Sequence, residues 1–341
     1  MLDIKAPSID PEAYVMPENI LAIIPTLNEE RHIEACIRSL MDGETDLRKV
    51  PLTIADGGST DRTVEIVEGL REEFPNIRVL NNPKRLQSAA MNLAAKNHAT
   101  ALTHTLVRCD AHSIYPQNFI LDVARSMDAQ QAASLVIPMD ATGETCFEKA
   151  NAWIVDTPLG SGGSAHRGGK SSGWVDHGHH AGFRLSMFRQ VNGYDESFSH
   201  NEDGEYDERV AQAGGRIYLD ADIRIKYVPR GSVARLAKQY FNYGKGRARN
   251  VNKHNSKLKI RQALPLLVLP LTVFGLIASP FFWPTLVLPL GYASVLGIAS
   301  IGVALWKKSP CGLLAGIASG TMHMSWAVGF FKQTLFGQSS I

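Results

Sequence analysis

Short apolar runs and amphipathic segments alternate along the first 140 residues of the chain. The apolar runs are four to six residues long, as buried strands are, and lie at 20–25, 51–55, 77–80, 105–109 and 134–137. Between them, apolar residues recur every three or four positions, as at Ile33, Ile37 and Leu40, which is the period of a helix. This alternation predicts an α/β domain with a doubly wound, mostly parallel sheet, in which ligands bind beyond the carboxyl ends of the strands.

The apolar pattern changes beyond residue 262. No Asp, Glu, Lys or Arg occurs from Gln262 to Trp306, or again from 309 to 331. A membrane-spanning helix needs about 20 such residues, so we predict three spans, at about 263–283, 285–306 and 310–331. The alternative is a soluble apolar helical domain, which is disfavoured because soluble helices need a polar face.

Charge divides the chain near the same place. All 33 Asp and Glu precede residue 223, so residues 1–222 carry a formal charge of −13, whereas the remainder holds 15 Lys and Arg and no acid. Twelve of those 15 lie in 223–262, where Ser232 can cap a helix with Leu236 and Tyr240 on its apolar side. This pattern is typical of an interfacial helix, or more simply of a positive-inside topology signal. Both interpretations place the segment at the cytoplasmic membrane surface, and the adjoining spans argue against nucleic acid as a partner.

These patterns predict four parts: a lead-in at 1–17, an α/β domain at 18–222, a basic interfacial segment at 223–262 and membrane helices at 263–331. The Gly- and Ser-rich stretch 160–173 is either a flexible surface loop or a lid. The four cysteines are widely spaced and form no CxxC pair. We therefore expect no disulfide framework and no cysteine-rich zinc site, as in a reducing compartment.

Acid-bearing turns carry the candidate chemistry, three of them at the ends of predicted strands. They read PTLNE at 25–29, DGGSTD at 56–61, DAH at 110–112 and ED at 202–203. Taken singly, an Asp-Gly turn is commonly only a turn, and an Asp before a helix is commonly only a cap. Their order and their positions relative to the strands instead indicate one site.

With these four motifs in order, residues 18–250 resemble glycosyltransferase family 2, whose members have the GT-A fold. The DAH triplet, the QYFNYGKGR stretch at 239–247 and the C-terminal spans are most similar to bacterial exopolysaccharide enzymes of the succinoglycan glucosyltransferase type. The resemblance implies an inverting enzyme that moves a hexose, glucose, from a UDP-sugar to a saccharide linked to a polyprenyl diphosphate lipid. It implies a multi-pass protein of the inner membrane with a cytoplasmic catalytic domain.

Two other functions stay open. One is a polyisoprenyl-phosphate sugar transferase, which charges the lipid itself. The other, from a different class, is a nucleotide-sugar-binding module that regulates a membrane assembly. Loss of Asp203 beside an intact nucleotide pocket would favour the regulatory module, and the sequence retains Asp203.

The resemblance also assigns donor-side residues. Pro25, Thr26 and Glu29 would line the nucleoside pocket, and Asp56 would accept a hydrogen bond from the uracil N–H, a charge-assisted contact. Arg85 would contact the nucleotide.

The resemblance places a divalent ion, Mn²⁺ or Mg²⁺, on Asp110 and His112. His112 stands where the family usually has an aspartate, and Mn²⁺ accepts imidazole more readily than Mg²⁺ does. The metal's identity is therefore open, and a surface histidine beside the site is the alternative for His112.

On the acceptor side, the resemblance makes Asp203 the general base and Glu202 a residue that orients the acceptor. Lys245 and Arg247 would contact the diphosphate. His180, with His177 and His179, forms a cluster that we interpret as polar loop residues near the acceptor, a metal role being the alternative. Asp203 as a mere helix cap also stays open.

Overall fold

A computed structural model describes residues 15–163, 167 and 169–337, and these residues form two compact units. One, the sheet unit, comprises the chain up to Asp140 together with 168–226. The other, the helical unit, comprises 141–167 together with 227–341. Residues 141–167, which lie inside the α/β domain predicted at 18–222, group with the C-terminal helices. Residues 164–166 and 168 of the predicted Gly-rich loop lie outside the described residues.

The sheet unit contains an eight-stranded sheet in the order β3-β2-β1-β4-β8-β5-β9-β7. Its strands are β1 (Ile20–Thr26), β2 (Leu52–Asp56), β3 (Ile77–Asn81), β4 (Thr105–Arg108), β5 (Ser134–Ile137), β7 (Gly173–Val175), β8 (His179–Arg184) and β9 (Ile217–Leu219). Strands β1 to β4 run parallel, as do β5 and β9, while β8 is antiparallel to both of its neighbours. Two further strands, β6 (Met139–Ala141) and β10 (Ile225–Tyr227), pair separately. The mostly parallel sheet and all five predicted strands are confirmed.

Helices cover both faces of this sheet. They are α1 (Ile33–Leu40), α2 (Thr63–Leu70), α3 (Gln87–Asn97), α4 (Phe119–Gln130), α7 (Leu185–Gln190) and α8 (Glu202–Gln212), with short 3₁₀ turns η1 (Pro17–Asn19) and η2 (Thr45–Lys49). Successive residues of β8 face opposite sides of the sheet. Phe183 lies in a buried cluster with Met91 of α3 and Tyr206 of α8, whereas a Cβ on Gly182 would come 2.6 Å from the Met127 sulfur of α4. A larger residue at position 182 would push α4 off the sheet.

The helix after β1 begins at Ile33 and not at Asn28, where the sequence suggests a cap. Asn28 has a left-handed backbone with φ of 55°, and its side-chain oxygen accepts a hydrogen bond from the backbone N–H of Thr60 at 2.8 Å. Asn28 therefore ties two loops together at the carboxyl ends of β1 and β2.

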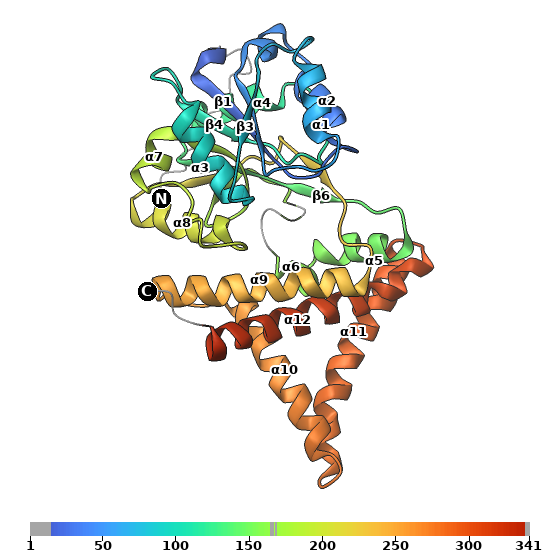
Figure 1. The fold of residues 1–341 in the computed structure, drawn as a ribbon. Coiled ribbons are helices and arrows are strands. Elements are labelled where there is room, and N and C mark those ends of the chain that lie inside the picture. Colours follow the sequence, from blue (N-terminus) through green and yellow to red (C-terminus); the bar gives the residue numbers. More distant parts are fainter. Residues whose placement is uncertain (1–14, 164–166, 168, 338–341) are drawn as a thin grey trace, which may run out of the picture. The chain divides into compact units, whose positions relative to one another are not determined.

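The helical unit pairs two long helices side by side and projects a hairpin away from them (Figure 1). Its elements are α5 (Cys146–Val155), α6 (Pro158–Ser161), α9 (Val233–His254), α10 (Ile260–Ala278), η3 (Trp283–Leu286), α11 (Val287–Trp306), η4 (Pro310–Leu314) and α12 (Ala315–Phe336). As predicted, the Ser232 hydroxyl caps α9 by accepting from the backbone N–H of Arg235. Glycines allow α9 and α12 to touch backbone to backbone: a Cβ on Gly244 would collide with the Trp326 carbonyl oxygen, and one on Gly329 with Phe241.

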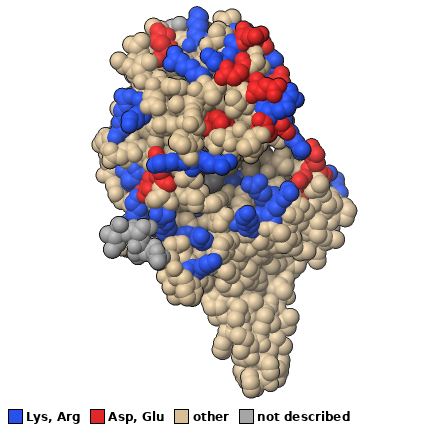
Figure 2. Space-filling view, viewed as in Figure 1, with Lys and Arg blue, Asp and Glu red and all other residues tan. Residues whose placement is uncertain are grey.

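By length and composition, two helices among the described residues could cross a membrane. They are α10 and the continuous η3–α11 segment, Trp283–Trp306. Between Arg261 in the first turn of α10 and Lys307 after α11 this hairpin carries no Asp, Glu, Lys or Arg, and Figure 2 shows no charged side chains toward its tip. The third predicted span corresponds to α12, which is not one of the two candidates, carries Lys332 and packs along the basic helix α9.

The structure corrects the expectation of fully reduced cysteines. Cys146, at the start of α5, is disulfide-bonded to Cys311 in η4, with their Cα atoms 4.9 Å apart. The pair is 165 residues apart in sequence, so spacing alone gave no sign of it. Cys36 and Cys109 are free and buried, and burial raises the pKa of both thiols.

Candidate active site

The carboxyl ends of β1 and β2 bring the predicted donor residues together. Pro25 and Thr26 end β1, and Thr26 lies directly opposite Asp56 in the parallel register. Asp56 is buried, and its carboxylate accepts hydrogen bonds from the backbone N–H of Gly58 at 2.9 Å and from the Ser59 hydroxyl at 2.6 Å. Asp56 therefore closes its own turn, the structural role that a lone Asp-Gly pair predicts.

Gly57 lies close to both Thr26 and Arg85. Its N–H donates to the Thr26 carbonyl at 2.8 Å, and a Cβ at Gly57 would come 3.5 Å from the Arg85 Cα. Arg85 itself has a left-handed backbone with φ of 56° and an exposed side chain. The structure thus gathers Thr26, Asp56 and Arg85 around one glycine at the sheet edge.

The two candidate metal ligands, Asp110 and His112, lie next to different partners. A carboxylate oxygen of Asp110 lies 3.6 Å from Nε2 of His179, and Nδ1 of His112 lies 3.2 Å from Oε1 of Glu29. Glu29, predicted in the nucleoside pocket, is therefore next to the candidate metal motif. The His112 side chain is 62% exposed, and that of Asp110 is 24% exposed.

These residues fit a divalent ion that takes its remaining ligands from a nucleotide. Among the described residues, no three His, Cys, Asp or Glu side chains are arranged to hold an ion by themselves. A carboxylate with nearby imidazoles suits Mn²⁺, and Mg²⁺ also commonly takes one or two protein carboxylates plus substrate phosphates and water. Asp110 is anchored for such a role because its backbone N–H donates to the Tyr115 hydroxyl at 2.5 Å.

Asp203, whose side chain is 21% exposed, lies in a polar cluster at the start of α8. Its carboxylate accepts from the Arg108 guanidinium at 2.8 and 3.4 Å and from the Tyr194 hydroxyl at 2.6 Å. Arg108 also donates to the Tyr194 oxygen at 3.0 Å, and its side chain is only 2% exposed. Since Arg108 lies two residues before Asp110, the cluster joins the candidate base to the candidate metal motif.

The two neighbouring acids have opposite pKa shifts. Burial alone raises the pKa of Asp203, but the charges of Arg108 and His180 and the hydrogen bonds from Arg108 and Tyr194 hold it below its usual range. Burial and the Asp203 charge together raise the pKa of Glu202 to about 7. At neutral pH Asp203 is therefore ionised, whereas Glu202 is near its midpoint.

His180 is fully buried and lies in strand β8, whereas the sequence predicted a polar loop residue near the acceptor. Its Nε2 lies 2.7 Å from one oxygen of Asp207, and His177 Nδ1 lies 2.6 Å from the other. Burial alone raises the pKa of Asp207, but the nearby histidines outweigh it and lower that pKa. This pairing fixes β8 against α8, so His180 supports the helix that carries Asp203.

Sequence reasoning missed the roles of Arg108, Tyr194, His179 and Asp207. Arg108 had a usable signal, because a cation inside the apolar run at 105–109 needs a buried partner. The other three had no such signal, since the partners that define their roles lie 9 to 86 residues away in sequence.

Lys245 and Arg247 belong to α9 in the helical unit, and their predicted contact with the diphosphate stays a prediction. The Lys245 ammonium lies 6.0 Å from the centre of the Phe241 ring on the same helix.

Comparisons with known proteins agree with this geometry. The family model described as "Glycosyl transferase family 2" matches residues 21–191. The chain is 43% identical over 317 residues to "Succinoglycan biosynthesis protein ExoA" of Rhizobium meliloti (strain 1021), covering 92% of this chain and 94% of that protein.

Two more distant similarities extend over most of the chain. A Methanococcus voltae protein, "Dolichyl N-acetyl-alpha-D-glucosaminyl phosphate 3-beta-D-2,3-diacetamido-2,3-dideoxy-beta-D-glucuronosyltransferase", is 24% identical over 329 residues, covering 94% of this chain and 98% of its own. The solved mannosyltransferase PcManGT from Pyrobaculum calidifontis superposes with a TM-score of 0.58 at 18% identity, over 94% of this chain and 88% of its own, and so supports the GT-A fold. The matching family model, the closely similar relative and the acidic clusters at the sheet edge together establish that this chain is a glycosyltransferase and belongs to glycosyl transferase family 2.

Proposed function

We propose that this enzyme is an inverting, metal-dependent hexosyltransferase of bacterial exopolysaccharide biosynthesis. It moves glucose from UDP-glucose to a saccharide carried on a polyprenyl diphosphate lipid, at the cytoplasmic face of the plasma membrane. The observation that carries the proposal is the Arg108–Tyr194–Asp203 cluster two residues from the metal motif. It supports an ionised carboxylate held close to the place where a diphosphate would bind.

The chemistry on the acceptor side follows from Asp203. An acceptor hydroxyl attacks the anomeric carbon, its proton passes to the Asp203 carboxylate, and the bond from that carbon to the diphosphate oxygen breaks with its electron pair. A carboxylate of low pKa accepts this proton only in the transition state, when the new C–O bond has made the hydroxyl acidic. Arg108 and Tyr194 hold the carboxylate in one orientation, so less conformational entropy is lost when the transition state forms. Attack opposite the leaving group inverts the anomeric carbon.

On the donor side, Thr26, Asp56 and Arg85 bind the nucleotide and orient its sugar. Asp110 and His112 would hold the divalent ion, which when bound neutralises the charge that develops on the departing diphosphate. The mannosyltransferase neighbour was solved in complex with GDP-Man and Mn²⁺, in keeping with this assignment.

The acceptor and the membrane setting are inferred from other features. The Rhizobium relative is named for succinoglycan biosynthesis, and the Methanococcus relative is named for a dolichyl-linked sugar phosphate acceptor. The uncharged α10–α11 hairpin and the basic helix α9 fit a protein that meets such a lipid at the membrane surface.

Radiolabelled donors test the reaction. Membrane extract supplied with the purified enzyme and UDP-glucose is expected to give a labelled lipid-linked oligosaccharide with a new β-glycosidic linkage. Label that appears only on a monosaccharide phosphate lipid would favour the polyisoprenyl-phosphate sugar transferase. The absence of transfer from every sugar nucleotide, with UDP binding intact, would contradict the proposal and favour a regulatory module.

Calorimetry tests the donor site separately. UDP is expected to bind more tightly with Mn²⁺ than with EDTA, and Asp56→Ala is expected to weaken UDP binding because the uracil loses its charged partner and the turn loses its closure. Equal affinity in EDTA would remove the ion from the proposal. Unchanged affinity in Asp56→Ala would remove Asp56.

A further inference from the structure

Matching stripes of side chains run along α9 and α12, and each contributes residues to the lining of a groove between the two helices. On α9 they are Lys238, Phe241 and Lys245, spaced i, i+3 and i+7, which places them on one side of the helix. On α12 the same spacing recurs at Ser325, Val328 and Lys332. Because the two helices run in the same direction, with Leu236 near Met322 and Gly244 near Trp326 and Phe330, the stripes lie along each other.

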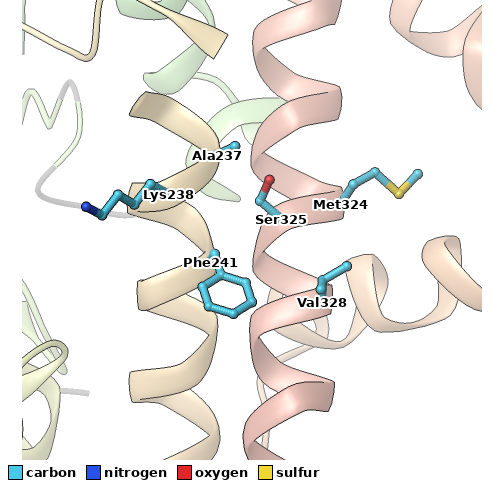
Figure 3. A pocket seen from close by; sticks show the side chains of 6 residues that line it. All are labelled: Ala237, Lys238, Phe241, Met324, Ser325 and Val328. Carbon is cyan, nitrogen blue, oxygen red and sulfur yellow. The ribbon is translucent and has the colours of Figure 1, made fainter. Parts of the chain in front are cut away.

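The groove has the size and lining of a site for an apolar chain. Its volume is about 350 Å³, within the range of roughly 300–1,000 Å³ typical of small-molecule sites. Its lining is mainly apolar and consists of Ala237, Lys238, Phe241, Met324, Ser325 and Val328 (Figure 3). A hydrocarbon chain fits such a surface better than a sugar or a nucleotide, which would leave polar groups unpaired.

Cations from both helices converge at one place along this groove. The ammonium of Lys332 lies 5.6 Å from the centre of the Phe241 ring, and that of Lys245 lies 6.0 Å from it. Lys238 lines the groove one turn earlier. Neither helix contains an Asp or a Glu. Since like charges gathered over one ring repel each other, a multivalent anion bound there would relieve the repulsion.

We propose that the α9–α12 groove binds the lipid-linked acceptor itself, through its diphosphate and the first isoprenoid units of its chain. The diphosphate would lie among Lys238, Lys245 and Lys332, and the chain would lie along Phe241 and Val328. A diphosphate carries more negative charge than the phosphodiester of an ordinary phospholipid. The diphosphate therefore matches the charge of three lysines better than a phosphodiester does. This assignment rests on the proposed function, since it names the site for that function's acceptor.

Farnesyl diphosphate is the probe for the test, titrated calorimetrically into the full-length protein in nonionic detergent. We expect it to bind more tightly than inorganic pyrophosphate or farnesol, and not to be displaced by phosphatidylglycerol. The Lys238→Gln/Lys332→Gln protein is expected to lose about tenfold in affinity, as for lost charged hydrogen bonds. Val328→Trp is expected to lose a similar amount by filling the groove. Two control variants carry the same types of change outside the groove, namely Lys257→Gln/Lys307→Gln and Val295→Trp. Both should bind farnesyl diphosphate as the wild type does.

Several results would overturn the groove assignment. Equal binding of pyrophosphate would reduce the site to a surface for free phosphate. Displacement by phosphatidylglycerol would make it a surface for bulk anionic lipid. Groove variants that bind as their controls do would place the lipid elsewhere. UDP titrated into the same preparations separates the two proposals, because lost UDP binding with farnesyl diphosphate binding intact contradicts the donor side alone.

Discussion

The Asp203 carboxylate accepts hydrogen bonds from both Arg108 and Tyr194. These bonds determine the expected effects of substitutions in this cluster. Asp203 lies within the first turn of α8, whose N-cap residue is Asn201, so it is not the helix cap that the sequence left open. Asp203→Asn keeps the volume of the side chain but removes the proton acceptor. We expect the transfer rate to fall by about 10²- to 10⁴-fold, the usual contribution of a general base. UDP affinity, measured by calorimetry, should stay within about twofold and serves as the folding control. A folded Asp203→Asn enzyme with near wild-type rate would make Asp203 a structural residue only.

Tyr194→Phe separates orientation from proton transfer. The change removes the 2.6 Å hydrogen bond to Asp203 but leaves the carboxylate and its Arg108 partner in place. We expect a loss of about tenfold in transfer rate, because one of the bonds that orients the base is missing while the base itself remains. A loss as large as that of Asp203→Asn would mean that the phenol takes part in the chemistry directly.

Glu202 gives the enzyme a pH-dependent stability. Folding raises its pKa from 4.5 to about 7, so its protonated form is favoured in the folded state. The resulting stability is fully present below about pH 4.5 and is lost as pH rises through 7. Glu202→Gln removes the cost of ionising this carboxyl in the folded state. The melting temperature of the variant should therefore match that of the wild type near pH 4.5 and exceed it by about 5 °C at pH 8. The exposed control Glu72→Gln should show no such pH trend, and a pH-independent difference for Glu202→Gln would contradict the assignment.

At the scale of the elements, the contact between α9 and α12 depends on glycine. The backbones meet at Gly244, where a Cβ would collide with the Trp326 carbonyl oxygen. We expect Gly244→Ala to force the helices apart and to lower the free energy of unfolding by about 1–3 kcal/mol. Gly302→Ala in α11 is the matched control, since nothing lies within 4 Å of its Cβ position. Denaturant unfolding in detergent measures both, and equal stability of the two variants would mean that the close helix contact is absent in solution.

At the scale of the whole molecule, charge predicts the topology. Eleven basic residues between 223 and 259 precede α10, and a twelfth, Arg261, lies in its first turn. Lys307 and Lys308 follow α11, whereas residues 262–306 carry no charge. The positive-inside rule then places both ends of the hairpin in the cytoplasm. Because α12 packs along α9, we also place the C-terminal end of α12 there, and not outside as a third span would.

Cysteine labelling in intact cells tests this topology. A membrane-impermeant thiol reagent is expected to label Ser279→Cys in the hairpin turn, but not Ser232→Cys or Thr334→Cys. The background is low, since the native cysteines are buried or disulfide-bonded. Labelling of Ser232→Cys from outside would invert the whole arrangement, and labelling of Thr334→Cys alone would restore the third span.

The local features of this protein were predictable from its sequence. The strands β1 to β5, the Ser232 cap of α9 and the uncharged hairpin all follow from short-range patterns, namely runs of four to six apolar residues, helical periodicity and capping chemistry. The order of the acidic motifs also indicated the family, because each motif directly follows or precedes a local element.

Only the tertiary structure determined which distant side chains meet. The order β4-β8-β5 carries His179 to Asp110 and His180 to Asp207, and the buried Arg108 to the start of α8. The grouping of 141–167 with the C-terminal helices, its disulfide and the packing of α12 on α9 are equally long-range. Periodicity records which face of an element is apolar, but not which other element covers that face. That choice depends on sheet order and helix packing, which bring together residues as far apart in sequence as Cys146 and Cys311, 165 positions apart.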